Sequence, residues 1–454
     1  LRNGNTWEIT LAWFRSNGLI NDNGFSPAGT AVDKTINRSA WQTTIDAAQQ
    51  HYQPGVFTSF IAYEWSADAG DLTAHMHRNV IYRGTNVAEL PFSSLDSHRP
   101  EDLWAFLEKQ NQQGKTAFAI PHNANFSRGN MYAPRDSEGK ALTAQYAEMR
   151  NRYEPVSEIL QIKGSSETHP LLSSEDEFAN FAILGESLFT GKETMETIKG
   201  SYTRDALRVG MELSHSEGFN PFKFGVIGSS DSHNASSPSE ENNYTGKLPM
   251  LDGSAGLRTD QALRLPEGIN PVTRWGSGGL AAVWAEENTR ESIFDALGRK
   301  ETYATSGPRI ALRFFSGWHF SAAMLKQNNF IEQAYAGGVP MGGELLAGPK
   351  NQAPAFVIIA AKDPLGANLD RVQIIKAWID KNGKSHERVY DVSAADERRI
   401  NPATGQLAEV GNTVDIKRAK YENSIGGAII SAHWVDPDFT PGQQAFYYAR
   451  VLEI

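Results

Sequence analysis

The sequence contains no cysteine. This absence excludes disulfide bonds, thiolate catalysis and cysteine-ligated zinc. The chain also lacks an uninterrupted apolar run approaching the ~18 residues that a membrane helix needs. A cysteine-free composition favours a periplasmic or secreted protein, although cytoplasmic proteins without cysteine exist. Any metal site in this chain must therefore be built from histidine and carboxylate side chains.

Positive charge is scarcer than negative charge. The 43 Lys and Arg residues are outnumbered by 53 Asp and Glu residues, which gives a net charge of -10. Nucleic-acid binding depends on basic surfaces that contact phosphates, so we expect no nucleic-acid partner. The sequence also lacks a Walker loop, a G-x-G-x-x-G turn after a strand and a G-x-S-x-G elbow, which disfavours NTPase, dinucleotide-binding and serine-hydrolase functions.

Four apolar segments end in residues that can bind a metal. In FKFGVIGSSDSHN (residues 222–234), a short run typical of a buried strand breaks into a loop that presents Asp231 and His233. Three other segments have the same design: 56–65 ending in Glu64, 116–123 ending in His122, and 156–169 ending in Glu167 and His169. The repetition predicts one site where the ends of these strands converge.

Strand-like segments alternate with helical patterns in the first two thirds of the chain. Helices are predicted over 39–53, 100–113, 143–152, 193–217 and 289–300. Such alternation is typical of parallel βα units, whose catalytic residues collect at the carboxyl ends of the strands. From about residue 309, strand-like runs are joined by Asp-, Gly-, Asn- and Pro-bearing turns, which predicts an antiparallel sandwich. We therefore divide the chain into an α/β region over 1–308 and a β-rich region over 309–454.

Each candidate ligand has a less specific alternative. Glu64 is well placed to bridge two metals, but a carboxylate at a strand end can also be structural. Asp231 and His233 could form an Asx-turn beside a satisfied histidine, and His122 could simply be a loop histidine. His75 and His77 lie two residues apart and would share a strand face, and we favour His77 as the ligand.

Two further residues are candidates for catalysis. Glu167 lies among small residues in GSSETHP and could act as a general acid/base or an outer metal ligand, or simply be a loop acid. Arg78 could bind an anionic group of a substrate, or pair with a surface acid. We carry both residues forward as catalytic candidates.

Six motifs of the chain resemble, in order, the DUF3604 family. They are FIAYEW, LTAHMHRNVIYRG, AIPHNAN, EILQIKGSSETHP, FGVIGSSDSHN and AVWAEENTRESIFDALGRKETYATSGPRI. That family looks like a branch of the polymerase-and-histidinol-phosphatase (PHP) superfamily of metal-dependent phosphoesterases. The resemblance extends over nearly the whole chain.

The resemblance implies a fold and a ligand set. The fold would be a distorted, seven-stranded β/α barrel related to the TIM barrel, holding two or three zinc, manganese or iron ions. Its metal ligands would be Glu64 as the bridge, His77, His122, Asp231 and His233. The superfamily also has an N-terminal His-x-His strand that this chain lacks, and the end of the chain, RVLEI, stops where the family is expected to continue. We therefore expect the chain to lack both termini of a longer protein.

These observations predict a metal-dependent hydrolase of phosphate esters that uses a metal-activated water. The expected partner is a small anionic ester. Two alternatives stay open. One is hydrolysis of another bond, such as a sulfate ester or phosphodiester. The other is a non-catalytic binding protein with a decayed site.

Overall fold

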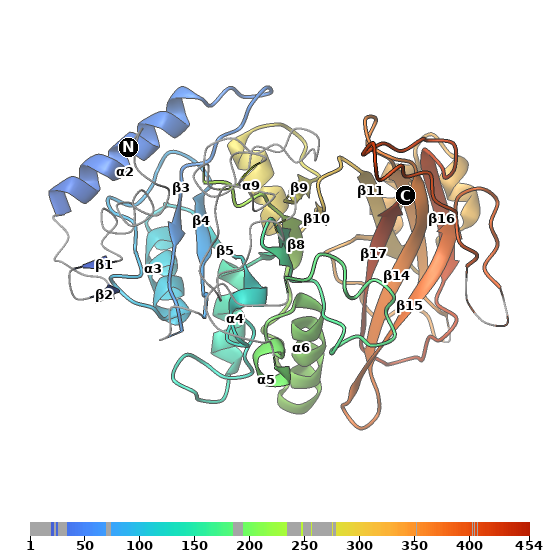
Figure 1. Cartoon of the computed structure of the whole chain (residues 1–454). Helices are drawn as coiled ribbons and strands as arrows, with labels where there is room; N and C mark the ends of the chain where they lie inside the picture. Colours follow the sequence, from blue (N-terminus) through green and yellow to red (C-terminus); the bar gives the residue numbers. More distant parts are fainter. Residues whose placement is uncertain are drawn as a thin grey trace.

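The structure of the chain is a computed structural model. It describes residues 20–21, 24–25, 34–69, 74–184, 194–233, 247, 256, 275, 278–350, 352–401, 403, 405 and 407–454. Figure 1 shows a mixed region of helices and short strands beside a region of long strands at the carboxyl end. Strands β1 (Ile20–Asn21) and β2 (Gly24–Phe25) form a small antiparallel pair before the mixed region.

The first sheet of the mixed region has the order β3-β4-β5, and both of its strand pairs are antiparallel. Its elements are β3 (Ala62–Trp65), β4 (Arg78–Tyr82) and β5 (Ala117–Pro121), with helices α2 (Lys34–Gln50) and α3 (Pro100–Gln112). Trp41 of α2 and Trp104 of α3 share one buried core with Val80 of β4. The two helices therefore pack on this sheet and fix its position.

A second sheet has the order β7-β6-β8. Its elements and the helices around it are α4 (Ala144–Tyr153), β6 (Val156–Gln161), β7 (Gly164–Ser165), α5 (Met195–Ile198), α6 (Thr203–Glu217) and β8 (Gly225–Gly228), with a short 3-10 helix at Ala124–Phe126. Strands β6 and β8 are parallel, whereas β7 is antiparallel to β6. The chain between β6 and β8 passes through α5 and α6, as a parallel crossover requires.

The last pair of the mixed region is antiparallel. It consists of β9 (Leu280–Val283) and β10 (Thr302–Thr305), with α9 (Arg290–Gly298) between them in sequence. Thr289 caps α9, because its hydroxyl accepts a hydrogen bond of 3.3 Å from the Ser292 amide.

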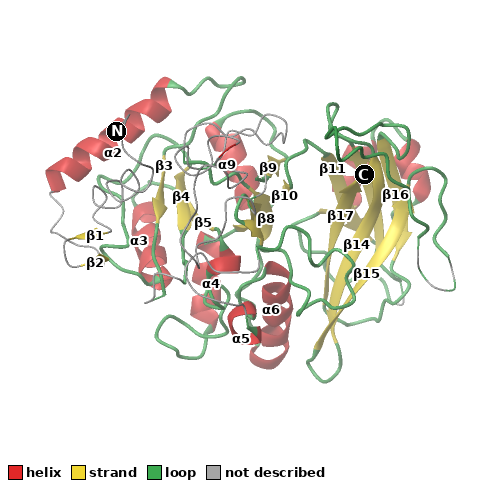
Figure 2. Ribbon diagram, in the orientation of Figure 1, coloured by secondary structure: helices red, strands yellow, loops and turns green. Residues whose placement is uncertain are grey.

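The carboxyl-terminal strands form two antiparallel sheets, with the orders β12-β11-β13-β16 and β15-β14-β17. The elements here are β11 (Ala311–Gly317), a 3-10 helix (Ala322–Lys326), α10 (Phe330–Gly337), β12 (Gly338–Pro340), β13 (Ala355–Ala361), β14 (Leu369–Ile379), β15 (Ser385–Ala394), β16 (Ile429–Val435) and β17 (Ala445–Glu453). Phe314 and Phe356 from one sheet share a buried core with Val372 and Ile374 from the other. Figure 2 shows how strongly strands dominate this part of the chain.

The predicted β/α barrel is wrong. Within the described residues, strands form small separate sheets and no closed barrel, and β6 with β8 is the one parallel pair. The alternation of strands and helices misled the prediction because β3, β4 and β5 pair antiparallel even though α3 intervenes between β4 and β5. The fold is mixed α/β with many antiparallel pairs. The division into domains at residue 308 stays a prediction.

Two predicted helices differ from the structure in their limits. The helix predicted over 39–53 begins and ends earlier, as α2 (Lys34–Gln50). The helix predicted over 193–217 is split into α5 and α6 around Gly200, which has a φ of 78°. A side chain at this position would collide with the backbone of Gly129, so close packing and the left-handed backbone together require glycine. Among the helices described, none is both long and apolar enough to cross a membrane.

Candidate metal centre

One end of the first sheet brings together Glu64, His77 and His122. Glu64 lies near the carboxyl end of β3, His77 directly precedes β4, and His122 directly follows β5. Because β4 runs antiparallel to both neighbours, its start lies beside the ends of the other two strands. The His122 amide donates to the His77 carbonyl at 3.2 Å, which holds two of the three residues together.

The three side chains converge on one point. Glu64 Oε1 lies 2.8 Å from His77 Nδ1 and 3.3 Å from His122 Nε2. One ligand atom from each residue lies within 4.8 Å of the other two. This is the one group of potential metal ligands found among the described residues. We call it the triad.

The triad is partly open to solvent. The exposed fraction of the side chain is 34% for Glu64, 22% for His77 and 4% for His122. Burial opposes ionisation of Glu64, but hydrogen bonds from His122 and His77 hold its pKa far below the ordinary value. Burial lowers the pKa of His77, whereas Glu64, Glu158 and Asp231 outweigh burial and raise the pKa of His122.

The donor set fits a divalent cation. Two imidazole nitrogens and one carboxylate oxygen are the ligands of many catalytic zinc sites, which leave a fourth position open for water. Of the two ring nitrogens of His122, Nε2 lies 3.3 Å from Glu64 Oε1 and can face a cation between the two side chains, whereas the buried Nδ1 has no hydrogen-bond partner among the described residues. The residues present would hold one cation, with the more exposed Glu64 side leaving room for a water molecule.

Sequence reasoning missed Glu158. This residue lies in β6, is 2% exposed and contributes to the electrostatic environment of His122. Its carboxylate accepts hydrogen bonds from Gln161 Nε2 at 3.0 Å and from the Ser229 hydroxyl. Burial raises the pKa of Glu158, against the opposing effects of His122 and Ser229. An acidic residue inside the apolar segment VSEILQ was the signal that could have identified it.

Asp231 lies close enough to His122 for its charge to raise the pKa of His122, but two lysines hold it. Its side chain is 11% exposed, and Lys163 Nζ lies 2.7 Å from its Oδ2, to which Lys247 Nζ also donates. Burial opposes ionisation of Asp231, and the two lysines reverse this effect and lower its pKa. The His233 side chain is exposed and contacts the Asp231 carbonyl through Nδ1 at 2.9 Å. The structure therefore groups neither Asp231 nor His233 with the triad.

His75 stacks on His77, with ring centroids 4.6 Å apart. Its Nδ1 is buried and has no hydrogen-bond partner among the described residues. Burial lowers the pKa of His75, and the charges of His77 and Lys163 add to this effect. His75 therefore packs against the His77 ring of the triad.

Arg78 lies in the core. It is 0% exposed, its Nε donates to Glu154 Oε1 at 2.9 Å, and its guanidinium lies over the Trp65 ring. Neighbouring strand residues point to opposite faces, so Arg78 points away from the face on which His77 meets Glu64. The structure does not bring Arg78 to the triad.

Glu167 also lies apart from the triad. Its Oε1 accepts hydrogen bonds of 2.7 Å from both Arg204 Nη2 and the Tyr448 hydroxyl. Burial raises the pKa of Glu167, but Arg204 and Arg450 outweigh burial and lower it. Nearby, His169 Nδ1 accepts a hydrogen bond of 3.1 Å from the Leu171 amide. These contacts connect Glu167 to the carboxyl-terminal sheet.

Comparison with known families gives a match over nearly the whole chain. The family described as "Protein of unknown function (DUF3604)" matches residues 11–454. No curated protein and no solved structure matches the chain.

Proposed function

The chain belongs to the DUF3604 family, and from the geometry of its triad we propose that it is a metal-dependent hydrolase of phosphate esters. The observation that carries the proposal is the convergence of Glu64, His77 and His122 ligand atoms within 4.8 Å of one another. A site of three protein ligands with partial exposure is the arrangement that catalytic metal centres use.

A cation in the triad would supply two kinds of chemistry, namely a lower pKa for bound water and Lewis-acid polarisation of a phosphoryl oxygen. Glu64 and the two histidines would hold it in their unprotonated forms. Glu158 is the residue that we assign to proton transfer. It lies buried near His122, its carboxylate is oriented by hydrogen bonds from Gln161 and Ser229, and burial raises its pKa.

A relationship to the PHP superfamily is part of this proposal. It is supported by the motifs that contain Glu64, His77 and His122, and it does not depend on a barrel. The triad supplies ligands for one cation. The further cations that the resemblance implies would need Asp231 and His233, and Asp231 is already paired with two ammonium groups.

The test is turnover of p-nitrophenyl phosphate by the metal-free chain and after addition of zinc or manganese. We expect activity to depend on the added metal and to be lost in Glu64→Ala and His122→Ala. His51→Ala removes an exposed histidine just after α2 and serves as the matched control. Activity that survives chelation and both triad substitutions would exclude the proposed mechanism.

Metal content of the purified chain separates this proposal from a non-catalytic binding role. About one zinc or manganese ion per chain, lost in Glu64→Ala, agrees with a functional triad. A chain that binds no metal at micromolar zinc or manganese would support a decayed site. A panel that includes a sulfate ester and a phosphodiester then defines the hydrolysed bond.

A further inference from the structure

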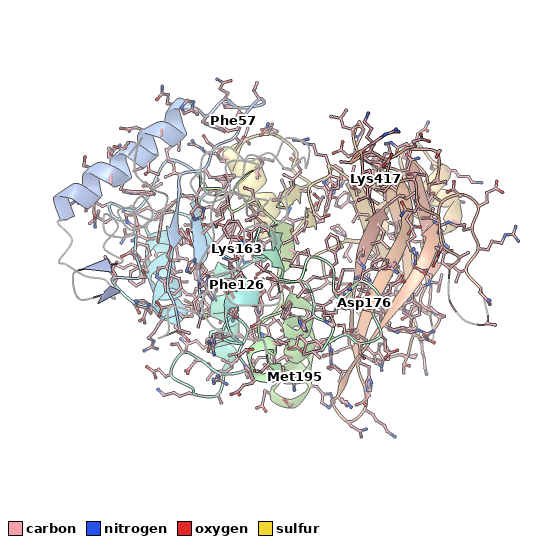
Figure 3. The ribbon with its side chains drawn as sticks, viewed as in Figure 1. Phe57, Phe126, Lys163, Asp176, Met195 and Lys417 are labelled. Atoms are coloured by element: carbon pink, nitrogen blue, oxygen red, sulfur yellow. The ribbon has the colours of Figure 1, made fainter. Side chains whose placement is uncertain are left out.

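Two lysines from separate segments converge on one oxygen beside the triad. Lys163 lies in the turn between β6 and β7, and Lys247 lies far away in sequence. Both ammonium groups contact Asp231 Oδ2, and the Lys163 contact is 2.7 Å. Figure 3 shows Lys163 near the middle of the molecule beside Phe126, in agreement with the 3.1 Å hydrogen bond from Asn125 Nδ2 to the Lys163 carbonyl.

Both lysines are buried, which is unusual for this residue type. The exposed fraction of the side chain is 8% for Lys163 and 6% for Lys247. Lysine is almost never fully buried without a charged partner, because desolvation of an ammonium group is costly. Asp231 provides that partner and adopts a left-handed backbone with a φ of 52°. Such a conformation is uncommon outside glycine and marks this position for attention as a functional site.

The turn that carries Lys163 lies beside the triad. The Lys163 carbonyl accepts a hydrogen bond of 3.1 Å from Asn125 Nδ2, and the carbonyl of the next residue, Phe126, accepts one of 3.0 Å from the His75 amide. The His75 ring in turn stacks on His77, with ring centroids 4.6 Å apart. The carboxyl end of β6 therefore places one of the two ammonium groups next to the ligands that the first sheet supplies.

This arrangement disagrees with a second cation on Asp231. A metal ion bound by Oδ2 would lie next to two ammonium groups and be repelled by both. Lysine instead binds phosphate-like groups as a point charge. An ammonium group has three N–H donors, and the ion pair with Asp231 uses one of the three on Lys163. Asp231 Oδ2 occupies the point that both ammonium groups reach, so a substrate oxygen would accept from the other N–H donors of Lys163.

From this geometry we propose that Lys163, with Lys247, forms an oxyanion subsite that binds the tetrahedral anionic group of the substrate beside the triad. Asp231 is a positioning residue that holds the two ammonium groups in place. This inference rests on the proposed function, because it assigns the substrate group to a position beside the triad. It names a phosphoryl or sulfuryl group, which have the same tetrahedral oxyanion chemistry.

The experiment is calorimetric titration of the zinc-loaded full chain with inorganic phosphate and, separately, with inorganic sulfate. Lys163→Met should weaken phosphate binding at least about tenfold, since a hydrogen bond to a charged group is lost. The double variant Lys163→Met with Asp231→Asn removes both charges of this ion pair. It can replace the single variant if Lys163→Met alone folds poorly. The double variant should also bind phosphate weakly, whereas Asp231→Asn alone should bind it at least as well as the parent.

Lys376→Met is the matched control. The Lys376 side chain is 1% exposed and pairs with Asp436 at 2.6 Å in the carboxyl-terminal sheets, so its loss removes a buried lysine far from the triad in the fold. Its phosphate affinity should equal that of the parent. Tighter binding of phosphate than sulfate would assign the subsite to phosphoryl groups, and the reverse order to sulfuryl groups.

Two results would overturn the subsite. One is unchanged phosphate affinity in Lys163→Met, and the other is two bound metal ions per chain with one lost in Asp231→Asn. Failure of the proposed function has a different signature, namely absence of metal or turnover in the parent. Phosphate titration of the metal-free chain then measures the contribution of Lys163 independently of that failure.

Discussion

Two polar clusters of the molecule differ in the groups that pair with their carboxylates. The first is the triad with its neighbours Glu158 and Asp231. The second, which we call the interface network, consists of Glu167, Asp176, Arg204, Glu387, Tyr448 and Arg450. In the triad, the Glu64 carboxylate pairs with two imidazole nitrogens, whereas the carboxylates of the interface network pair with the guanidinium groups of Arg204 and Arg450. A neutral imidazole nitrogen can bind a metal ion, whereas a guanidinium group stays protonated and can only pair with anions. The first cluster is therefore suited to bind a cation, and the second is suited to hold the fold together.

The interface network connects the mixed region to the carboxyl-terminal strands. Arg204 of α6 lies 2.9 Å from Asp176 Oδ2, and Arg450 of β17 lies 2.6 Å from Asp176 Oδ1. Figure 3 places Asp176 where the two regions meet. Beside this network, Met211 of α6 packs on Ala377 and Phe446. Ionic and apolar contacts therefore act together across this boundary.

The largest expected effect is on folding stability, in Glu167→Gln. This change leaves the Arg204 guanidinium without one of its buried anionic partners, and guanidinium cannot lose its proton. Breaking a buried ion pair typically costs about 3–5 kcal/mol. We expect the free energy of unfolding in urea to fall by about 3 kcal/mol, with metal content of the folded protein unchanged.

The control for Glu167→Gln is Glu148→Gln, which affects an exposed pair with Arg152. Exposed pairs contribute about 0–1 kcal/mol, so this variant should unfold almost as the parent does. If Glu167→Gln instead kept full stability but lost turnover, Glu167 would be a catalytic residue and the contrast between the clusters would not hold.

The next effect is on metal affinity, in His77→Ala. His77 Nδ1 lies 2.8 Å from Glu64 Oε1, so its loss removes one of three converging ligand atoms. Loss of an outer-shell partner alone typically weakens metal binding by about 10–100-fold, and loss of a ligand should cost at least about 100-fold. Zinc competition with a chromogenic chelator measures this change. Unchanged affinity would show that the metal binds elsewhere.

These two clusters also show what the sequence could and could not reveal. The three residues of the triad were identifiable because each lies at one end of a short apolar strand. The structure brings all three together. The predicted reason was wrong, since the strands are antiparallel and His77 precedes its strand. Register and strand direction depend on contacts between distant segments, which periodicity along one chain does not encode.

Glu167 and Arg78 illustrate the opposite error. Both occur in motifs rich in small or polar residues, but their roles depend on partners far away in sequence. Tyr448 is 281 residues from Glu167, and Glu154 is 76 residues from Arg78. The sequence alone did not indicate these partners. A charged residue near candidate ligands is therefore weak evidence for catalysis until its partners are known.

A third prediction concerns acid. Burial raises the pKa of Asp176, but Arg450 and Arg204 outweigh burial and lower it from 3.8 to about 2. A carboxyl group whose pKa is lowered in the folded state stabilises the fold at pH values above its ordinary pKa. This contribution is lost as the pH falls toward 2. The difference in unfolding free energy between the parent and Asp176→Asn should therefore shrink by about 2 kcal/mol between pH 5 and pH 2. A difference that stays constant would show that Asp176 is not held by these arginines.

The smallest expected effect is the change in folding stability caused by Glu64→Gln in the metal-free chain at pH 8. It contrasts most sharply with the effect of Glu167→Gln. The partners of Glu64 are imidazoles, which can lose their protons near neutral pH, so no permanently charged group is left buried. Gln keeps the size of Glu and can still accept one hydrogen bond. We expect the free energy of unfolding to change by less than about 1 kcal/mol, compared with about 3 kcal/mol for the same substitution at Glu167. Equal losses in the two variants would mean that the triad is a structural ion pair, and the assignment of a metal to it would then lose its physical basis.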